Sequence, residues 1–360
     1  MTTVLDTAQS YPGFEPLSDA DFARDMDERV VPFVNRLRKA HRLKTENGKN
    51  IYCETLVPDL TEQGAQKVRG LIVLFHGFCE FCSKFDEFTY YILQQGYALC
   101  RFDEFGHGFS GREIGDSSKV HIERFQTYVD CAYEVVVKIA EPLAAELGKT
   151  LGDGKERDGG KAPPLLLFSH SMGGAVAALF LEQHPSVFKA AVLASPMLEF
   201  FPKKRSQNTA HLFVKMLRAF GKGKTYFPGQ KKFDGTYSFS AEKALTCSKN
   251  RFLYHFNKRH AQTRYQTWGG TVAWLDESVK ALNRIFKKKE LKKITVPILV
   301  FQAEKDATVS NGGQNRFVEA VPSARLAVCP GANHELYNGT DETLRRWYPE
   351  LFKFYDEFSK

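Results

Sequence analysis

The stretch "LLLFSHSMGG", residues 165–174, reads as a buried strand that turns abruptly into a helix. Its apolar first half is typical of a strand covered on both faces of a parallel sheet. A strand–turn–helix junction of this kind presents its central residue, here Ser171, at the carboxyl edge of the sheet. The residues two positions away must be small, and they are Ser169 and Gly173. We therefore predict that Ser171 is a nucleophile, that Ser169 is packed, and that His170 lines the turn.

The rest of the chain repeats the alternation of strand and helix. Such alternation indicates βαβ units, an open and mostly parallel sheet, and helices on both of its faces. Residues 51–58 alternate weakly and suit an antiparallel edge strand. Buried strands are expected at 70–75, 97–102, 165–169, 189–195, 297–302 and 325–330, and helices at 83–95, 123–147, 172–184 and 341–359.

The alternation predicts a division of the chain into three parts. Residues 1–45 form an N-terminal extension with a helix that Ser18 caps and that runs over 19–39. No buried strand is expected in 197–285, which we interpret as a helical cap over the carboxyl edge of the sheet, where open α/β sheets bind ligands. The core then comprises 46–196 and 286–360. Within the core, the Gly-rich, charged stretch 148–164 is expected to be a surface loop.

A serine nucleophile needs a base, and the base needs an anion to hold its tautomer. For this kind of turn the expected chain order is serine, acid, histidine. Asp306 lies four residues beyond the strand 297–302, and His334 follows the last predicted strand. Both are expected at the edge that carries Ser171. Glu304 and Glu199 are the alternative acids, the first at the wrong offset and the second before the cap.

An acyl-transfer site also needs backbone donors for the oxyanion. We expect one to be the N–H of Met172, directly after the nucleophile at a helix N-terminus. The second is expected in the loop "FHGFCEF" (75–81), where His76 and Gly77 form a tight bend and the N–H of Phe78 is the candidate donor.

Composition and charge indicate the cellular environment and the kind of surface that the chain meets. The chain has 360 residues with a formal net charge of +8, yet residues 199–293 hold 22 Lys/Arg against only 6 Asp/Glu. A basic block of this kind suits an anionic surface. Seven scattered cysteines suggest reduced thiols and a cytoplasmic chain, with Cys79 and Cys82 as ordinary free cysteines. We expect no membrane span and no metal or organic cofactor.

With these motifs in place, the chain resembles the α/β-hydrolase superfamily, its monoacylglycerol lipase-like branch, and most closely bacterial lysophospholipases. The similarity runs from about residue 48 to the C-terminus. It is carried by "DEFGHGFSGR" (103–112), "SHSMGGA" (169–175), "LTCSKNRF" (245–252), "WGGTVAWLDESV" (268–279), "FQAEKDATVSN" (301–311) and "GANHELY" (331–337). The resemblance implies an α/β-hydrolase fold with a helical cap and serine hydrolysis of the ester of a lipid with one acyl chain. It also matches Glu80 to a glutamate that shapes the polar end of the site or braces the loop.

The cap supplies aromatic residues for an acyl chain and lysines for an anionic interface. We expect Phe200, Phe213 and Phe220 to contact substrate, and the basic cap to dock on the anionic inner face of a membrane. The alternative is that the lysines are solvated and that the apolar stripe of this segment packs on the sheet; the stripe consists of Leu212, Phe213, Met216, Leu217 and Phe220. No nucleic-acid motif accompanies "KKKELKK" (287–293), so nucleic-acid binding is not expected.

Other functions stay open at this level. The scaffold also serves carboxylesterases of small esters and proline-iminopeptidase-like hydrolases, and a member that has lost its activity could act in binding. The sequence does not decide the head group, the acyl length or the oligomeric state.

Overall fold

The computed structural model describes residues 2–60, 67–149, 160–200, 212, 214–242 and 244–359. Within these ranges, nine strands form one sheet in the order β1-β11-β10-β8-β7-β4-β5-β3-β2, and β6 and β9 form a separate pair. All neighbours in the large sheet are parallel except at β3, which runs antiparallel to β5 and β2. The strands are β1 (Thr2–Val4), β2 (Arg38–Lys44), β3 (Asn50–Leu56), β4 (Leu71–Phe75), β5 (Ala98–Phe102), β6 (Lys119–Val120), β7 (Leu165–His170), β8 (Ala190–Ala194), β9 (Gly269–Gly270), β10 (Ile298–Ala303) and β11 (Ala324–Cys329).

The central strands are apolar throughout because both faces of the sheet are covered. In β4, Leu71, Val73 and Phe75 belong to one hydrophobic core, while Ile72 and Leu74 belong to the core on the opposite face. This alternation follows from the two-residue period of a strand. A continuous apolar run in the sequence therefore predicts such a strand, since every position must be apolar.

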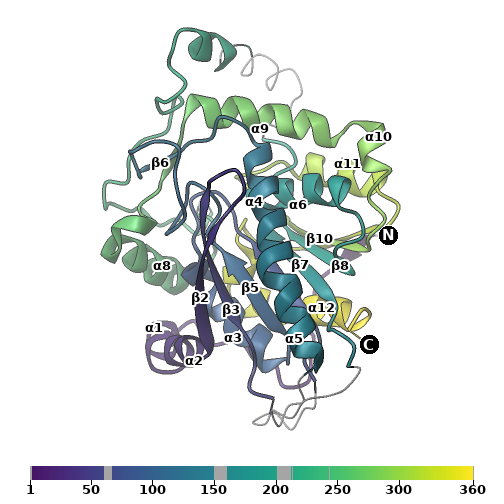
Figure 1. Ribbon diagram of the computed structural model, residues 1–360. Helices are drawn as coiled ribbons and strands as arrows, with labels where there is room; N and C mark the ends of the chain where they lie inside the picture. Colours follow the sequence, from purple (N-terminus) through teal and green to yellow (C-terminus); the bar gives the residue numbers. More distant parts are fainter. Residues whose placement is uncertain are drawn as a thin grey trace.

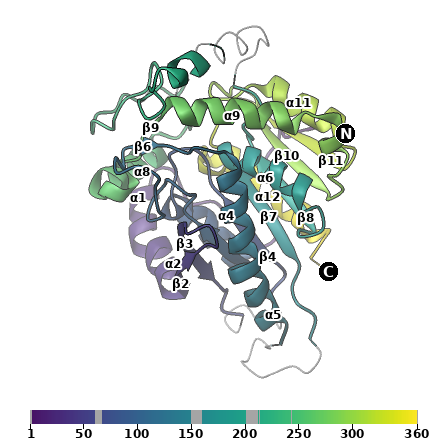
Figure 2. The same ribbon diagram turned by 45° about the horizontal axis from the view of Figure 1, so that its top comes forward.

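Helices pack on both faces. Figure 1 shows α4 and α5 in front of the sheet, and Figure 2 shows α9 lying across the end of α4 and α6. Helices α4, α5, α6, α9 and α11 contribute to one core, and α1, α2, α3 and α12 to the other. The helices are α1 (Phe22–Asp25), α2 (Val31–Leu37), α3 (Asp86–Gln94), α4 (Gln126–Val135), α5 (Glu141–Lys149), α6 (Met172–Gln183), α8 (Lys249–Ala261), α9 (Val272–Ile285), α10 (Lys288–Leu291), α11 (Asn311–Ala320) and α12 (Asp341–Asp356), with π-helical turns at Met26–Val30 and Val136–Ala140 and 3₁₀ turns at Cys82–Phe85, Thr263–Tyr265 and Leu336–Asn338.

The N-terminal extension departs from the sequence expectation. Its helical segment begins at Phe22 and ends at Leu37, so the prediction that Ser18 caps a helix over 19–39 was wrong at both ends. The residues that follow form β2, whose charged, half-exposed sequence is typical of an edge strand. A hairpin signal was present in the sequence: Asn47 precedes Gly48, which has a φ of 72° in the turn between β2 and β3.

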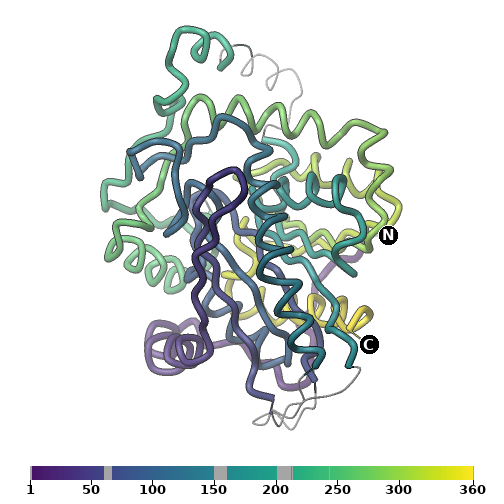
Figure 3. The backbone as a smooth tube through the Cα atoms, viewed as in Figure 1, coloured from purple at the N-terminus to yellow at the C-terminus, as the bar shows by residue number. Residues whose placement is uncertain are grey.

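The extension also changes both edges of the sheet. The strand expected at 51–58 is β3, but it is not an edge strand, because β2 pairs along its outer side. At the opposite edge β1 pairs in parallel with β11, and Figure 3 shows the N-terminus beside this part of the chain.

The chain between β8 and β10 adds no strand to the large sheet in its described part. It holds α8, α9, α10 and the two-residue β9, which pairs with β6. The cap boundaries 197–285 stay a prediction. Most of the predicted surface loop 148–164 lies outside the described residues, as does Phe213. No helix in the described ranges is long and apolar enough to cross a bilayer.

Candidate active site

Ser171 lies at the junction of β7 and α6, as the sequence predicts. Its backbone has φ 52° and ψ −117°, a strained conformation for a residue with a side chain. Gly173 permits the tight turn, since a Cβ there would lie 2.2 Å from the carbonyl oxygen of Phe75. Ser169 is fully buried and its hydroxyl donates to the carbonyl of Val192. The junction therefore holds the Ser171 side chain out of the strand while Ser169 stays packed.

The structure brings Ser171, His334 and Asp306 together from three different strand ends. The Ser171 Oγ lies 2.8 Å from His334 Nε2, and His334 Nδ1 lies 2.7 Å from Asp306 Oδ2. These contacts form a continuous chain from hydroxyl through imidazole to carboxylate. Such a chain can pass a proton from the serine to the histidine and stabilise the imidazolium that results.

Backbone donors hold Asp306 as an anion. Its Oδ1 accepts hydrogen bonds from the N–H groups of Thr308 (2.8 Å) and Val309 (3.0 Å). Burial by itself would raise the pKa of Asp306, but its interaction with His334 and these two donors lower the pKa below its ordinary value. The alternative acids lie elsewhere: Glu199 binds Ser310 and Arg316, and Glu304 accepts from the N–H of Gly331.

Of the two predicted oxyanion donors, Met172 directly follows Ser171, and Phe78 lines the same cavity as Ser171. Met172 is the first residue of α6, where an N–H has no partner within the helix. Phe78 follows Gly77, and the N–H groups of Phe78 and Met172 make no hydrogen bond to other described residues in the turns and loops. A Cβ on Gly77 would come within 3.0 Å of the Ser171 Cβ, so glycine is needed for this loop to approach the serine.

Glu80 is buried at the centre of a polar network behind this loop. Its Oε2 accepts from the N–H of Gly77 (2.6 Å) and lies 2.9 Å from His170 Nδ1. Its Oε1 accepts from Lys84 Nζ (2.9 Å) and the Tyr337 hydroxyl (2.7 Å). Burial alone would raise the pKa of Glu80, but these neighbours together lower it well below its ordinary value. Glu80 therefore braces the loop and also lines the cavity beside Ser171.

Sequence reasoning missed three members of this network. They are Lys84, Tyr337 and Glu335, which accepts from Lys84 Nζ at 2.5 Å. Glu80 precedes the 3₁₀ turn Cys82–Phe85 that holds Lys84, and Phe81 between them is extended, so their four-residue spacing did not predict this contact. The other two residues join the network only through the tertiary fold.

A cavity of about 190 Å³ opens at Ser171. A second cavity of about 370 Å³ adjoins it at Thr308 and reaches Phe200. The first cavity is lined by Phe78, Cys79, Glu80, Lys84, His170, Ser171, Leu245, Arg259, Trp268, Thr308, His334 and Glu335.

The structure places only some of the predicted substrate aromatics near the serine. Phe200, a predicted substrate contact, lies beside Trp274 with ring centroids 6.0 Å apart, and Phe227 and Phe78 pack near the same indole at 6.5 and 4.3 Å. Phe220 is not brought to either cavity, because its side chain is 74% exposed on the surface of the predicted cap. The prediction for Phe213 falls outside the described residues.

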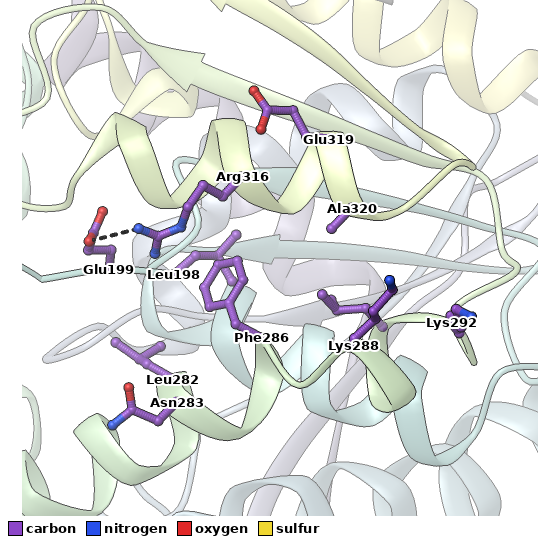
Figure 4. A pocket seen from close by; sticks show the side chains of 11 residues that line it. Leu198, Glu199, Leu282, Asn283, Phe286, Lys288, Lys292, Arg316, Glu319 and Ala320 are labelled. Atoms are coloured by element: carbon purple, nitrogen blue, oxygen red, sulfur yellow. Dashed lines mark hydrogen bonds and ion pairs between the residues drawn. The ribbon is translucent and has the colours of Figure 1, made fainter. Parts of the chain in front are cut away.

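A larger cavity, about 800 Å³, lies away from the serine. Figure 4 shows it between α9, α10 and α11, with Arg316 reaching across to Glu199. No member of the Ser171 hydrogen-bond chain lines it. In this cavity Arg316 is paired with Glu199, and its guanidinium also lies over the ring of Phe286.

A family model described as serine aminopeptidase, S33 (Hydrolase_4) matches residues 66–341. The chain belongs to this family. The hydrolase has the α/β-hydrolase fold, and the predicted fold class and family resemblance are confirmed.

Curated relatives and solved structures agree with that assignment. The hydrolase is 25% identical over 316 residues to a probable lysophospholipase L2 of Haemophilus influenzae, which covers 88% of this chain and 91% of the relative. It is 22% identical to a monoacylglycerol lipase of Mycolicibacterium smegmatis, over 86% and 95% of the two chains. Its fold matches a soluble variant of monoglyceride lipase from Saccharomyces cerevisiae with a TM-score of 0.68 and 16% identity, over 90% and 96% of the chains. A carboxyl esterase from Bacillus coagulans matches with a TM-score of 0.66, 16% identity, and coverage of 90% and 99%.

Proposed function

We propose that this hydrolase cleaves the carboxylic ester of a lipid with one acyl chain through an acyl-enzyme. The observation that carries the proposal is the hydrogen-bond chain from Ser171 through His334 to Asp306. The relatives named lysophospholipase and monoacylglycerol lipase support the substrate class, since they align over most of this chain.

The reaction proceeds in two steps. The Ser171 Oγ attacks the ester carbonyl while His334 Nε2 takes its proton, and the N–H groups of Met172 and Phe78 stabilise the oxyanion. His334 then returns the proton to the leaving alcohol, and Asp306 stabilises the imidazolium meanwhile. In the second step His334 activates water, which releases the fatty acid from Ser171.

The aromatic cluster around Trp274 is the proposed path of the acyl chain. Phe78, Phe200 and Phe227 surround this indole, and Phe200 lines the cavity next to that of Ser171. Burying an alkyl chain against such rings is favourable at about 0.8 kcal/mol per CH₂ group. Longer acyl chains should therefore bind more tightly.

A second candidate is a carboxylesterase of small esters, which the similarity to the Bacillus coagulans esterase favours. Acyl length separates the two: a preference for two- to four-carbon p-nitrophenyl esters, with no hydrolysis of long-chain monoacyl lipids, would favour the second. Proline p-nitroanilide tests the aminopeptidase-like alternative in the same assay.

The predicted cap, residues 197–285, is proposed to dock on an anionic bilayer. Leu212, Met216 and Phe220 are spaced by four residues and are 71%, 48% and 74% exposed, so these members of the predicted apolar stripe can contact lipid, whereas Leu217 packs against the hydrophobic core. Lysines such as Lys215 and Lys222 flank the stripe. Flotation with liposomes that contain or lack phosphatidylglycerol tests docking, with the triple serine variant of the stripe as control. Equal recovery on both kinds of liposome contradicts it.

The direct test of the proposed chemistry is covalent labelling. A fluorophosphonate probe should label the wild-type hydrolase and not Ser171→Ala, and Ser171→Ala should lose roughly four to six orders of magnitude in turnover while folding normally. If Ser171→Ala keeps an activity within tenfold of wild type, Ser171 is not the nucleophile. If the wild-type protein is not labelled at all, the chain has lost its catalytic activity and acts in binding.

A further inference from the structure

Arg259 is a buried cation in the cavity of Ser171. Arg259 lies in the last turn of α8 and is only 7% exposed. It lines the same cavity as Ser171 and Glu80.

The hydrogen bonds of Arg259 all go to neutral carbonyl groups. Nη1 donates to the carbonyls of Tyr265 (2.5 Å) and Thr267 (2.9 Å), and Nη2 donates to that of Cys79 (2.7 Å). A guanidinium has five N–H donors, so these three bonds leave one donor on Nε and one on Nη2 without a described protein acceptor. These two nitrogens are neighbours and can act together as a fork.

The carboxylates of this cavity are engaged by another cation. Lys84 Nζ binds Glu80 at 2.9 Å and Glu335 at 2.5 Å. Among the described residues, no carboxylate lies within ion-pair distance of Arg259. Burial lowers the pKa of the Arg259 guanidinium below its ordinary value, as expected for a desolvated cation without an anion in contact.

Two aromatic rings fix the plane of the guanidinium. Its carbon lies 5.3 Å from the centroid of Phe81 and 5.1 Å from that of Trp268. A fork held in this way is preorganised for two oxygens of one anion, the geometry in which arginine binds phosphate.

We propose that Arg259 binds the phosphate of a lysophospholipid substrate, so that the cavity is a subsite for a phosphorylated glycerol head group. The inference rests on the proposed ester hydrolysis at Ser171 and distinguishes lysophospholipids from monoacylglycerols. The cavity of about 190 Å³ is smaller than the roughly 300–1,000 Å³ of pockets that enclose whole drug-sized ligands, so we expect it to hold the head group while the acyl chain extends beyond it.

A purely structural role would look different in kinetics. Arg259 holds the carbonyl of Cys79, a residue with a φ of 60° next to the oxyanion donor Phe78. Loss of this brace alone would lower kcat for every ester by the same factor. Loss of a phosphate ligand would fall on phosphate-bearing substrates and mainly on KM.

The kinetic test compares lysophosphatidylethanolamine with monoolein at equal acyl length. Arg259→Gln should lower kcat/KM for the lysophospholipid on the order of 10- to 100-fold more than for monoolein, the range expected for hydrogen bonds to a charged group. Arg259→Lys should recover part of the difference. Arg264→Gln is the matched control, because it removes the same charge from an exposed position five residues away and should leave the ratio unchanged. An equal loss on both substrates in Arg259→Gln overturns the proposal.

A binding measurement separates this proposal from the proposed function. Calorimetry with glycerol 3-phosphate should detect binding to the wild type, none with glycerol, and at least tenfold weaker binding to Arg259→Gln. If fluorophosphonate labelling and ester hydrolysis are absent, the proposed function fails while this titration still reports on the phosphate subsite. If esters are hydrolysed but glycerol 3-phosphate does not bind, or binds Arg259→Gln equally, the phosphate subsite is wrong and the hydrolase stands.

Discussion

The carboxylate of Glu80 accepts a hydrogen bond from the backbone N–H of Gly77, 2.6 Å away, immediately before the proposed oxyanion donor Phe78. The same carboxylate is in contact with His170, whose Nε2 lies 3.4 Å from the carbonyl of His334. One buried anion thus supports the loop on one side of Ser171 and the base on the other.

Glu80→Gln should therefore slow catalysis without preventing folding. Its amide nitrogen cannot accept, so two of the four donors around Glu80 lose their acceptor and the Phe78 loop loosens. We expect kcat for p-nitrophenyl butyrate to fall roughly 10- to 100-fold with KM nearly unchanged, somewhat less than removal of an oxyanion donor costs. Glu46→Gln, at an exposed position, is the control. Wild-type kcat in Glu80→Gln would show that the loop does not need this brace.

Asp306→Asn should reduce kcat by about 10³- to 10⁴-fold. The amide keeps an oxygen for the N–H groups of Thr308 and Val309, so its NH₂ must face His334 Nδ1. The imidazole then carries its proton on Nε2 and cannot accept one from Ser171. Turnover of p-nitrophenyl butyrate and the rate of fluorophosphonate labelling should fall together, with an unchanged thermal midpoint. A loss under tenfold would remove Asp306 from the catalytic chain.

Glu182 should make the hydrolase less stable as pH rises from acidic values towards 8. This residue of α6 is buried, its carboxylate oxygens have no hydrogen-bond partner among the described residues, and burial raises its pKa to about 8. The folded state therefore holds a proton that the unfolded state has released, and the free energy of unfolding should decrease as pH rises from about 4.5 to 8.

Glu182→Gln should abolish this part of the pH dependence, because the amide mimics the protonated acid. Urea unfolding at pH 5, 7 and 9 should give similar stability for variant and wild type at pH 5 and a more stable variant at pH 9. Parallel curves for the two proteins would mean that Glu182 ionises normally in the fold.

Arg251 should contribute strongly to stability. It is fully buried, binds both oxygens of Glu87 at 2.9 and 3.1 Å, and joins α8 to Asp19 and Asp341. Arg251→Met leaves the buried Glu87 without its cation, which typically costs about 3–5 kcal/mol. The double variant with Glu87→Gln should recover part of this loss in guanidinium unfolding. Additive losses in the double variant would exclude a coupled pair.

Some features of the hydrolase follow from sequence alone. The strand at 165–170, the small residues around Ser171 and the order of Asp306 and His334 are local patterns. They are readable because a buried strand must be apolar throughout, and because loops at the carboxyl ends of parallel strands meet at one edge of the sheet.

Other features were decided by contacts between distant segments. Residues 38–44 form a strand only because β3 offers its unpaired edge, and the exposure of Phe220 depends on how the chain around it packs. Arg259 enters the cavity of Ser171 because α8 crosses the Cys79 loop, 180 residues earlier in the chain. Neither periodicity nor spacing in the sequence predicts these contacts. The free energy of a buried ion or an exposed ring depends on neighbouring residues that come together only in the folded chain.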